Sequence, residues 1–526
     1  MLLNTSHILK YYIILVFIVS LSCKKKQQTL FNTDYIFPIS SDSTTISKLL
    51  GFTNINIIEG DNCALLIDTL EIFKLRQQDF LPELDFIISD TLELPSIIFG
   101  FPFPPGFEIP YNFENDESFI FEDVELKKID FNSLKIKYTV ESNLTGGIYF
   151  DLTIPSAINS FGEAFNDIVN IPNSEGQLKE YTGEIFLSNY TFDLSNNQTT
   201  YNNLSTTLRV GCSEDNSNNI VLSSNSFLSI KLQLIDLNIK KIEGYFGSIN
   251  YADTNYFQLP TMRKLQSENF TVENPQLNLL IDNGIGIDSE VSINSLEFIK
   301  NQSSYFLNHQ LTSEPFEILR ATEINDLIEY SNQSFNINNQ NSNLNEIIPV
   351  FPESLNISYN ILTNPLGNYL NHSDFFNGNH TLESKIAVNI PFKFNLENLT
   401  YSDTIKITAP NKFDANSAKI HLEIENEFPI SCCIRLKLPN GDSLHIDSNC
   451  ISSANLNSLG NLQSASISNL IISISEEELD LIINEETIVV SLTFNSPTND
   501  IKYPISTLQK IKYKMGLELN YDFSLQ

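Results

Sequence analysis

Tryptophan is absent from this chain of 526 residues, and methionine occurs only 3 times. The lack of tryptophan removes the side chain that most often stacks on sugar rings. Other aromatic residues are plentiful, with 20 tyrosines and 37 phenylalanines. Because phenylalanine and tyrosine suit half-buried sheets, this aromatic composition favours β structure.

Basic residues are also scarce: 31 lysines and arginines face 64 aspartates and glutamates, which gives a formal net charge of −33. A polyanion of this size is repelled by nucleic acid and by anionic lipid head groups, so we expect no nucleic-acid partner. The sequence also contains no serine nucleophile elbow, HExxH, Walker loop or dinucleotide glycine fingerprint. We therefore predict a protein that is not an enzyme and has no cofactor.

Cysteines number six, and five remain when Cys23 is set aside. An odd set cannot pair completely, and no CxxC spacing supports a zinc or redox site. Neighbouring residues of a strand point to opposite faces, so only one of the adjacent Cys432 and Cys433 can meet Cys450 across a hairpin. We predict a Cys432–Cys450 disulfide, with buried thiols in an apolar strand as the alternative.

The N-terminus carries an apolar run from Tyr11 to Leu21, followed by Ser22, Cys23 and three lysines. The run is too short to span a bilayer and fits a cleaved secretory signal. It resembles the signal of a bacterial lipoprotein, with Ser20 where leucine is commonest, as in lipoproteins of Bacteroidota. The resemblance implies removal of residues 1–22, lipidation of Cys23 and anchoring in the outer membrane, with its periplasmic face favoured. The alternatives are a plain signal peptide before an incidental cysteine and an uncleaved anchor.

Alternation of apolar and polar residues dominates the rest of the chain. Leu134 to Val140 and Leu228 to Leu234 show the period of two that marks half-buried strands. After Ile235 the pattern slips by one residue, as a β-bulge requires. Helices are expected only as short connections, at Ser475–Glu478 and Asn343–Glu346, while Glu317–Tyr330 fits a helix or a bent strand. We predict an all-β chain of tandem antiparallel β-sandwich domains with a few short connecting helices.

A faint internal repeat joins two alternating strands through a turn led by asparagine. Its copies contain Asn143, Asn283 and Asn426 and lie roughly 140 residues apart, about the size of a β-sandwich domain. The unit predicts a hairpin, because asparagine tolerates a left-handed backbone. It resembles LEA-type β-sandwiches and large lipoproteins of Bacteroidota, a resemblance that implies no activity. The expected segments are a tether at 23–45, a β-rich leader with a Phe/Pro linker at 46–112, and sandwiches at 113–270, 271–410 and 411–526.

Two polar segments contain side chains that can bind metal ions. His372 and His380 flank Asp374, but their spacing matches no zinc pattern, so we predict a polar loop with two surface histidines. The segment Asp282–Asp288 offers oxygen atoms around a glycine turn but lacks the alternating donors of a calcium loop. We therefore predict no metal site.

The segment from residue 95 to 113 contains five prolines and several phenylalanines. Proline holds the backbone in extended forms, and an exposed strip of this kind could dock a partner protein. The alternative is a linker whose aromatic residues pack onto the following sandwich. The predicted docking strip consists of Phe99, Phe101, Phe103 and Phe107.

These observations lead to a first hypothesis of a non-catalytic envelope protein, bound to the membrane through its N-terminal lipid. It would serve as a scaffold or as the binding subunit of an outer-membrane complex, with a protein partner in the envelope. A second hypothesis is a carrier of lipid or another apolar ligand, with long strands such as 228–242 lining a groove. A third is a hydrolase that acts on glycan or peptide without a recognisable motif.

Overall fold

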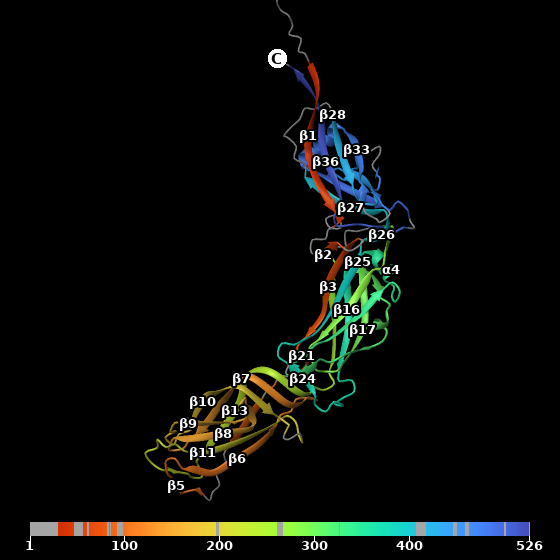
Figure 1. Cartoon of the computed structure of the whole chain (residues 1–526). Helices are drawn as coiled ribbons and strands as arrows, with labels where there is room; N and C mark the ends of the chain where they lie inside the picture. Colours follow the sequence, from red (N-terminus) through yellow and green to blue (C-terminus); the bar gives the residue numbers. More distant parts are fainter. Residues whose placement is uncertain are drawn as a thin grey trace, which may run out of the picture.

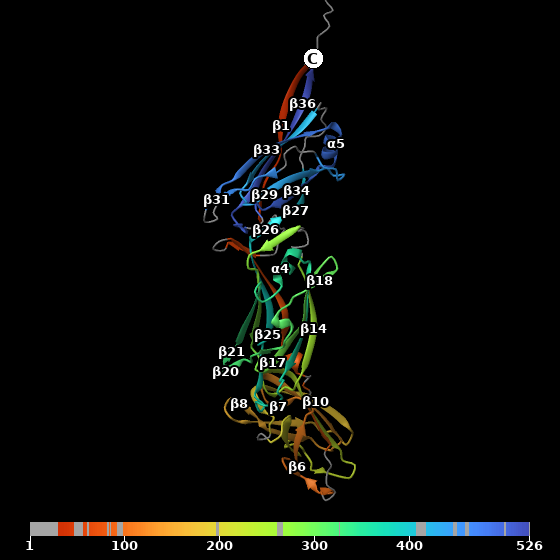
Figure 2. The same ribbon diagram turned by 90° about the vertical axis from the view of Figure 1, so that its right-hand side faces the viewer.

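The protein is an elongated array of three β-sandwiches, seen in two views in Figure 1 and Figure 2. The structure is a computed structural model. It describes residues 30–46, 56–59, 63–81, 84, 86–91, 98–195, 199–259, 267–325, 327–406, 417–444, 450–457, 462–498 and 501–524. Antiparallel pairing joins the strands of every sheet, so the predicted all-β class is confirmed. Below, the sandwiches are called terminal, middle and distal.

The terminal sandwich contains both described ends of the chain. Leu30 of its first strand lies opposite Ser524 of its last, and this pairing continues to Thr45 and Lys510. One sheet has the order β1 (Leu30–Thr45), β36 (Lys510–Ser524), β28 (Ser417–Asn426) and β33 (Ser466–Ile474). The other has the order β27 (Leu399–Lys406), β34 (Thr487–Asn495), β29 (Ser431–Lys437) and β30 (Cys450–Ile451), and a ribbon of β31 (Asn455–Leu456) and β32 (Leu462–Ser464) accompanies them.

The middle sandwich follows the terminal one along the array (Figure 1). A small sheet of β15 (Asn269–Val272), β26 (Lys393–Glu397) and β35 (Tyr503–Pro504) lies at the junction. The first middle sheet is β2 (Asn56–Glu59), β3 (Ala64–Leu75), β25 (Leu382–Pro391), β16 (Gln276–Asn283) and β22 (Ser331–Asn338). The second middle sheet has the order β14 (Asn250–Gln258), β23 (Ser354–Thr363), β17 (Ser289–Lys300) and β18 (Ser303–Phe306). A short strand, β19 (Phe316–Ile318), also pairs with β17, and β20 (Thr322–Ile324) pairs with β21 (Leu327–Glu329) as a separate ribbon.

The distal sandwich forms the end of the array that lies away from the chain ends (Figure 1). Its first layer is β4 (Phe86–Thr91), β13 (Leu228–Tyr245), β7 (Glu125–Ser142) and β10 (Lys179–Asp193), with β24 (Asp374–Asn377) on the same edge of β13 as β4. Its second layer is β6 (Glu108–Ser118), β11 (Asn203–Cys212), β8 (Ile148–Asn159) and β9 (Ala164–Ile171). A short pair, β5 (Pro102–Phe103) with β12 (Ile220–Val221), lies at the outer end.

All three sandwiches share one strand order. In one layer of each sandwich the strands correspond in the orders β1-β36-β28-β33, β3-β25-β16-β22 and β4-β13-β7-β10. In the other layer they correspond in the orders β27-β34-β29-β30, β14-β23-β17-β18 and β6-β11-β8-β9. The chain visits the corresponding strands in the same sequence each time. It leaves the terminal sandwich after β1 to build the middle one, and leaves the middle one after β3 to build the distal one. The sandwiches are therefore nested within one another rather than consecutive.

This nesting corrects part of the predicted division of the chain. Residues 30–45 of the expected tether form β1, which pairs with β36 along its length. The leader 46–112 contributes β2 and β3 to the middle sandwich and β4 to the distal one. The segments 113–270, 271–410 and 411–526 are likewise not separate pairing units, because β14 and β24 pair outside the segments that contain them. Sequence periodicity shows where strands lie, but the pairing partner is decided by contacts distant in sequence.

The predicted asparagine turn is present at Asn283 and Asn426, but in the first copy the corresponding residue is Ser142 and not Asn143. None of the three asparagines has a left-handed backbone, and each copy is an arch that crosses between layers, not the predicted hairpin. β7, β16 and β28 are each a central strand of one layer of their own sandwich, and the turn that follows leads to β8, β17 or β29 in the opposite layer. In the distal sandwich the two layers are also joined along one edge, because the end of β10 pairs with β8. A buried side-chain oxygen of Ser142, Asn283 or Asn426 accepts the N–H two residues further on, at 3.2, 2.9 and 3.0 Å. Each side chain gives a hydrogen-bond partner to a backbone N–H at the point where the strand pairing ends. Buried backbone groups need such a partner.

Short helices begin where the sequence predicts them. The capping box at Ser475 begins α5 (Glu476–Glu485), and Asn343 precedes α4 (Leu344–Ile347) and a 3-10 turn, η4 (Ile348–Val350). The slip after Ile235 is a bulge, because the β13–β7 register shifts there and Asp236 has φ of 53°. The bent-strand alternative holds for 317–330, which contains β20 and β21. Two further short helices are α3 (Gln77–Phe80) and η3 (Gln310–Thr312).

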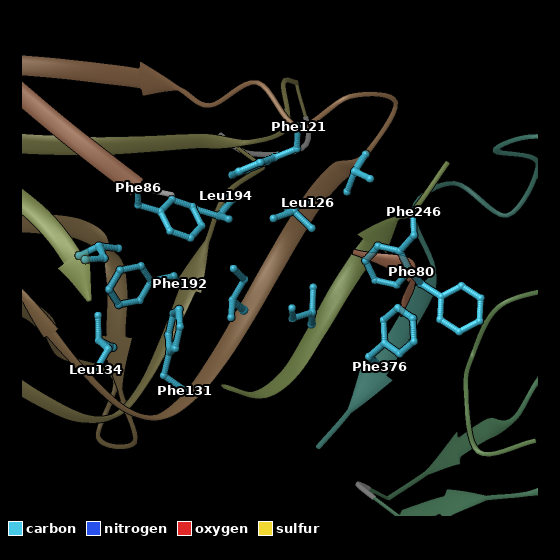
Figure 3. Close-up of a cluster of buried hydrophobic side chains, with 14 of the residues drawn as sticks. Phe80, Phe86, Phe121, Leu126, Phe131, Leu134, Phe192, Leu194, Phe246 and Phe376 are labelled. Carbon is cyan, nitrogen blue, oxygen red and sulfur yellow. The ribbon is translucent and has the colours of Figure 1, made fainter. Parts of the chain in front are cut away.

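A continuous apolar core joins the middle and distal sandwiches at an elbow. Phe80 of α3 packs 5.6 Å from Phe376 of β24, and Phe376 lies 5.0 Å from Phe246, measured between ring centroids (Figure 3). Beside them the buried carboxylate of Asp374 accepts hydrogen bonds from the Asn364 amide at 2.7 Å and the Phe246 N–H at 3.2 Å. Burial raises the Asp374 pKa even though these donors oppose the shift. The elbow is therefore packed across both sandwiches.

Candidate functional sites

The predicted lipidation site, Cys23, lies outside the described residues. The first described residue is Leu30, which begins β1 at the outer pole of the terminal sandwich. Among the described residues, no helix has the length and apolar character needed to cross a membrane. Lipidation of Cys23 therefore stays a prediction.

The predicted disulfide is wrong by one residue, because the bond joins Cys433 to Cys450. Cys432 points into the core together with Ile434 and Leu436, while Cys433 faces outward opposite Cys450. Cys432 and Cys212 stay outside any disulfide. Burial raises the pKa of the Cys212 thiol to about 11 and also raises that of Cys432, so both thiols are protonated and unreactive at neutral pH.

The predicted docking strip lies at the distal tip, where the structure divides its phenylalanines between core and surface. Phe103 of β5 is buried, and Phe99 packs partly against the same core. Phe101 and Phe107 instead expose 61% and 52% of their surface. Val221 of β12, which pairs with β5, exposes 50%. Pro102, Pro104 and Pro105 are also exposed. The linker alternative therefore describes Phe99 and Phe103, which pack onto the sandwich. Phe101 and Phe107 face outward, as the docking-strip prediction expects.

We define the tip patch as Phe101, Pro102, Pro104, Pro105, Phe107 and Val221. Backbone hydrogen bonds fix it, from the Gly106 N–H to the Cys212 carbonyl at 3.0 Å and from the Cys212 N–H to the Phe107 carbonyl at 2.9 Å. Most of the patch lies in the segment between β4 and β6, the first two strands of the distal sandwich. In the terminal and middle sandwiches, the corresponding segment of chain leaves to build the next sandwich. It lies at the end of the array farthest from the chain termini (Figure 1).

Acidic residues surround the tip patch. Glu108, Glu214 and Asp215 are exposed beside it, and the side chain of Glu214 lies against Gly106. Burial raises the pKa of Tyr149, and the charges of Glu108 and, less strongly, Glu214 raise it further. The tip is therefore an apolar surface with an acidic rim, a character that suits a partner with an apolar recess and basic residues around it.

A second site is a cleft of about 1040 Å³ at the elbow between the middle and distal sandwiches. Lys74 and Arg76 stand on one side of it, at the end of β3. The bulge of β13 and the adjoining part of β7 form the other side, where the Asn132 amide donates a hydrogen bond to Asn238 at 3.2 Å. The lining residues are Lys74, Arg76, Gln77, Gln78, Leu81, Leu84, Asn132, Leu237, Asn238, Ile239, Gly378, Asn379, His380 and Thr381.

Ion pairs order one wall of this elbow cleft. Lys74 lies 2.5 Å and Lys385 lies 2.9 Å from the Glu383 carboxylate, measured from nitrogen to oxygen. The hydrogen bond from Lys74, followed by the one from Lys385, holds the pKa of the Glu383 carboxyl at about 2. Two lysines therefore share the Glu383 carboxylate, and Lys385 also lies in the field of Asp282 and Glu71. The sequence reasoning missed this site; its one signal was the bulge after Ile235.

The two histidines of the polar loop have different surroundings, so the prediction that both lie on the surface is wrong. His372 is buried, stacks on Tyr201 at 3.5 Å between ring centroids, and lies 2.5 Å from the Glu125 carboxylate. His380 is half-buried, with Nδ1 2.8 Å from the Tyr330 hydroxyl. Across the described part of the chain, no group of three or more metal-ligating side chains comes together.

The groove expected along strand 228–242 is a filled core, since Leu228, Ile230, Leu232 and Leu234 are buried in the distal sandwich. An apolar space between the sheets of the terminal sandwich, lined by residues such as Ile405 and Met515, measures only about 40 Å³. This volume holds little more than a water molecule. These interiors therefore offer no support for a bound lipid.

Comparison with known proteins identifies no family. No family model matches the chain, and no curated protein matches it. Among solved structures, the chain is similar to a crystal structure described as "a putative secreted protein from Parabacteroides distasonis ATCC 8503". The two are 13% identical, the match covers 52% of this chain and 89% of the other, and the TM-score is 0.25. A likeness this weak carries no argument about function, and the resemblances to lipoproteins and LEA-type sandwiches stay predictions.

Proposed function

We propose that this protein is a non-catalytic, lipid-anchored spacer of the cell envelope that presents its distal tip to a protein partner. The observation that carries the proposal is the polarity of the array. The two described ends, Leu30 of β1 and Ser524 of β36, meet at one pole, while the tip patch lies at the opposite pole (Figure 1). A binding subunit held at its termini would expose this tip farthest from its anchor.

The anchor in this proposal is a lipid on Cys23 in the outer membrane, with the periplasmic face favoured. Cys23 precedes the first residue of β1 by only a short segment of sequence. The chain's excess of acidic residues would keep the array from lying on anionic head groups. The lysines that follow Cys23 would be the basic part nearest to the membrane.

The partner in this proposal is an envelope protein that offers an apolar recess rimmed by lysine or arginine. Exposed proline and phenylalanine supply rigid apolar contacts at the centre of the tip patch, and desolvated aromatic side chains commonly carry most of an interface's binding energy. The rim of Glu108, Glu214 and Asp215 would guide a basic partner and set its orientation.

Site-specific photo-crosslinking in the native membrane tests the proposal. A photo-reactive phenylalanine analogue replaces Phe101 in the full-length chain, and in a matched control it replaces Phe161. Phe161 belongs to the same sandwich and is 87% exposed, but it lies in the turn between β8 and β9, outside the tip patch.

We expect one defined protein adduct at position 101, lost when Phe107 is also changed to serine, and none at 161. The same adducts at both positions, or none at 101, would overturn the proposal of a docking tip.

A further inference from the structure

We propose that the elbow cleft binds an anionic oligosaccharide, a function separate from docking at the tip. The chain carries about twice as many acidic as basic residues, yet no aspartate or glutamate is among the described residues that line this cleft. Its charged side chains are Lys74 and Arg76. Within the described lining an anion would therefore meet cations and amides, while the neighbouring described carboxylates, Glu383 and Asp79, are engaged by Lys74 and by the Arg76 N–H.

The cations of the cleft are suited to a carboxylate or phosphate group. Arg76 is exposed, and a guanidinium can bind either anion through two parallel hydrogen bonds. Lys74 is held in place by Glu383, which also binds Lys385. Lys74 is thereby fixed beside the cleft, and the exposed Arg76 guanidinium is the cation that a ligand in the cleft can use.

The rest of the lining is suited to hydroxyl groups. Side-chain amides from both sandwiches, including Gln77, Asn132 and Asn238, present donors and acceptors together. Leu237 and Ile239 of the β13 bulge add an apolar surface for the C–H face of a sugar ring. The volume of about 1040 Å³ exceeds what a single small ion needs and accommodates several sugar units. Amides, hydrocarbon and cations together favour an acidic sugar chain over a simple anion.

Titration calorimetry on the full-length chain tests this inference with three probes. Tetragalacturonate presents carboxylates, glucose 1-phosphate presents a phosphate, and maltotetraose presents neutral hydroxyls only. The test variant is Arg76→Gln. The matched control is Arg435→Gln, which removes the same charge from an exposed position on β29 in the terminal sandwich.

We expect binding of at least one anionic probe, with Arg76→Gln weakening it by about tenfold and Arg435→Gln changing it less than about twofold. The two anionic probes distinguish a uronate from a phosphate ligand. We also expect the bound probe to slow hydrogen exchange at α3 and at residues 378–381. Equal binding of maltotetraose, no binding of either anion, or an affinity unchanged by Arg76→Gln would overturn the inference.

Discussion

Asn426→Ala should destabilise the terminal sandwich by about 3 kcal/mol, because the Asn426 side chain holds the arch between its two sheets. The fully buried amide donates to the carbonyls of Ile430 and Ser452 at 2.9 and 3.0 Å, and its oxygen accepts the Phe428 N–H at 3.0 Å. Alanine leaves these three backbone groups without that partner, and each such loss costs about 1 kcal/mol or more.

The three arches provide a graded series for this prediction. Asn283 makes two hydrogen bonds, to the Leu319 carbonyl and from the Ile285 N–H, so Asn283→Ala should cost about 2 kcal/mol. Ser142 accepts one, from the Leu144 N–H, so Ser142→Ala should cost about 1 kcal/mol. Asn469→Ala on the exposed outer face of β33 is the matched control, with an expected change within about 0.5 kcal/mol.

Urea unfolding followed by far-ultraviolet circular dichroism measures the series. Because the sandwiches need not unfold in one step, hydrogen exchange read on peptides of each sandwich assigns every loss to its own arch. If Asn426→Ala were as mild as Asn469→Ala, or if its loss appeared in another sandwich, the structural role given to the arches would be refuted.

Two further predictions concern charge and covalent structure. The pKa of Glu383 is lowered from 4.5 to about 2, so its ion pairs stabilise the fold above pH 4.5 and lose that effect as the pH falls toward 2. The difference in unfolding free energy between wild type and Glu383→Gln should therefore be about 1 kcal/mol at pH 7 and shrink on acidification, and a difference that grows in acid would contradict this. Replacing Cys433 and Cys450 by serine should cost about 3 kcal/mol, measured by urea unfolding. Non-reducing peptide mapping should recover the 433–450 bond, and a bond to Cys432 would contradict the assignment.

Much of the fold could be predicted from the sequence, because strand periodicity is local. The faces of β7 and β13, the bulge after Ile235 and the capping box of α5 all follow from neighbouring residues. The disulfide could also have been placed correctly. Cys432 has the same alternation as Ile434 and Leu436, which directs it into the core and leaves Cys433 to face Cys450.

The nesting could not be predicted in this way, because it depends on pairing between distant segments. The amide of Asn520 donates to Asp34 at 2.7 Å across 486 positions of sequence, and no local pattern marks such a partner. The elbow cleft has the same origin, since Lys74, Asn132, Asn238 and His380 come from four separate segments. Only the tip patch, which is continuous in sequence apart from Val221, had a compositional signal.

Small-angle X-ray scattering tests most directly whether the chain is an extended spacer, which the separation of its ends from its tip requires. The Cys23→Ser chain, which cannot carry the lipid, is the sample. Three sandwiches with strands of 16, 12 and 18 residues along the array, at about 3.3 Å per residue, predict a radius of gyration on the order of 40 Å. A value close to the roughly 24 Å of a compact chain of this length would contradict the spacer.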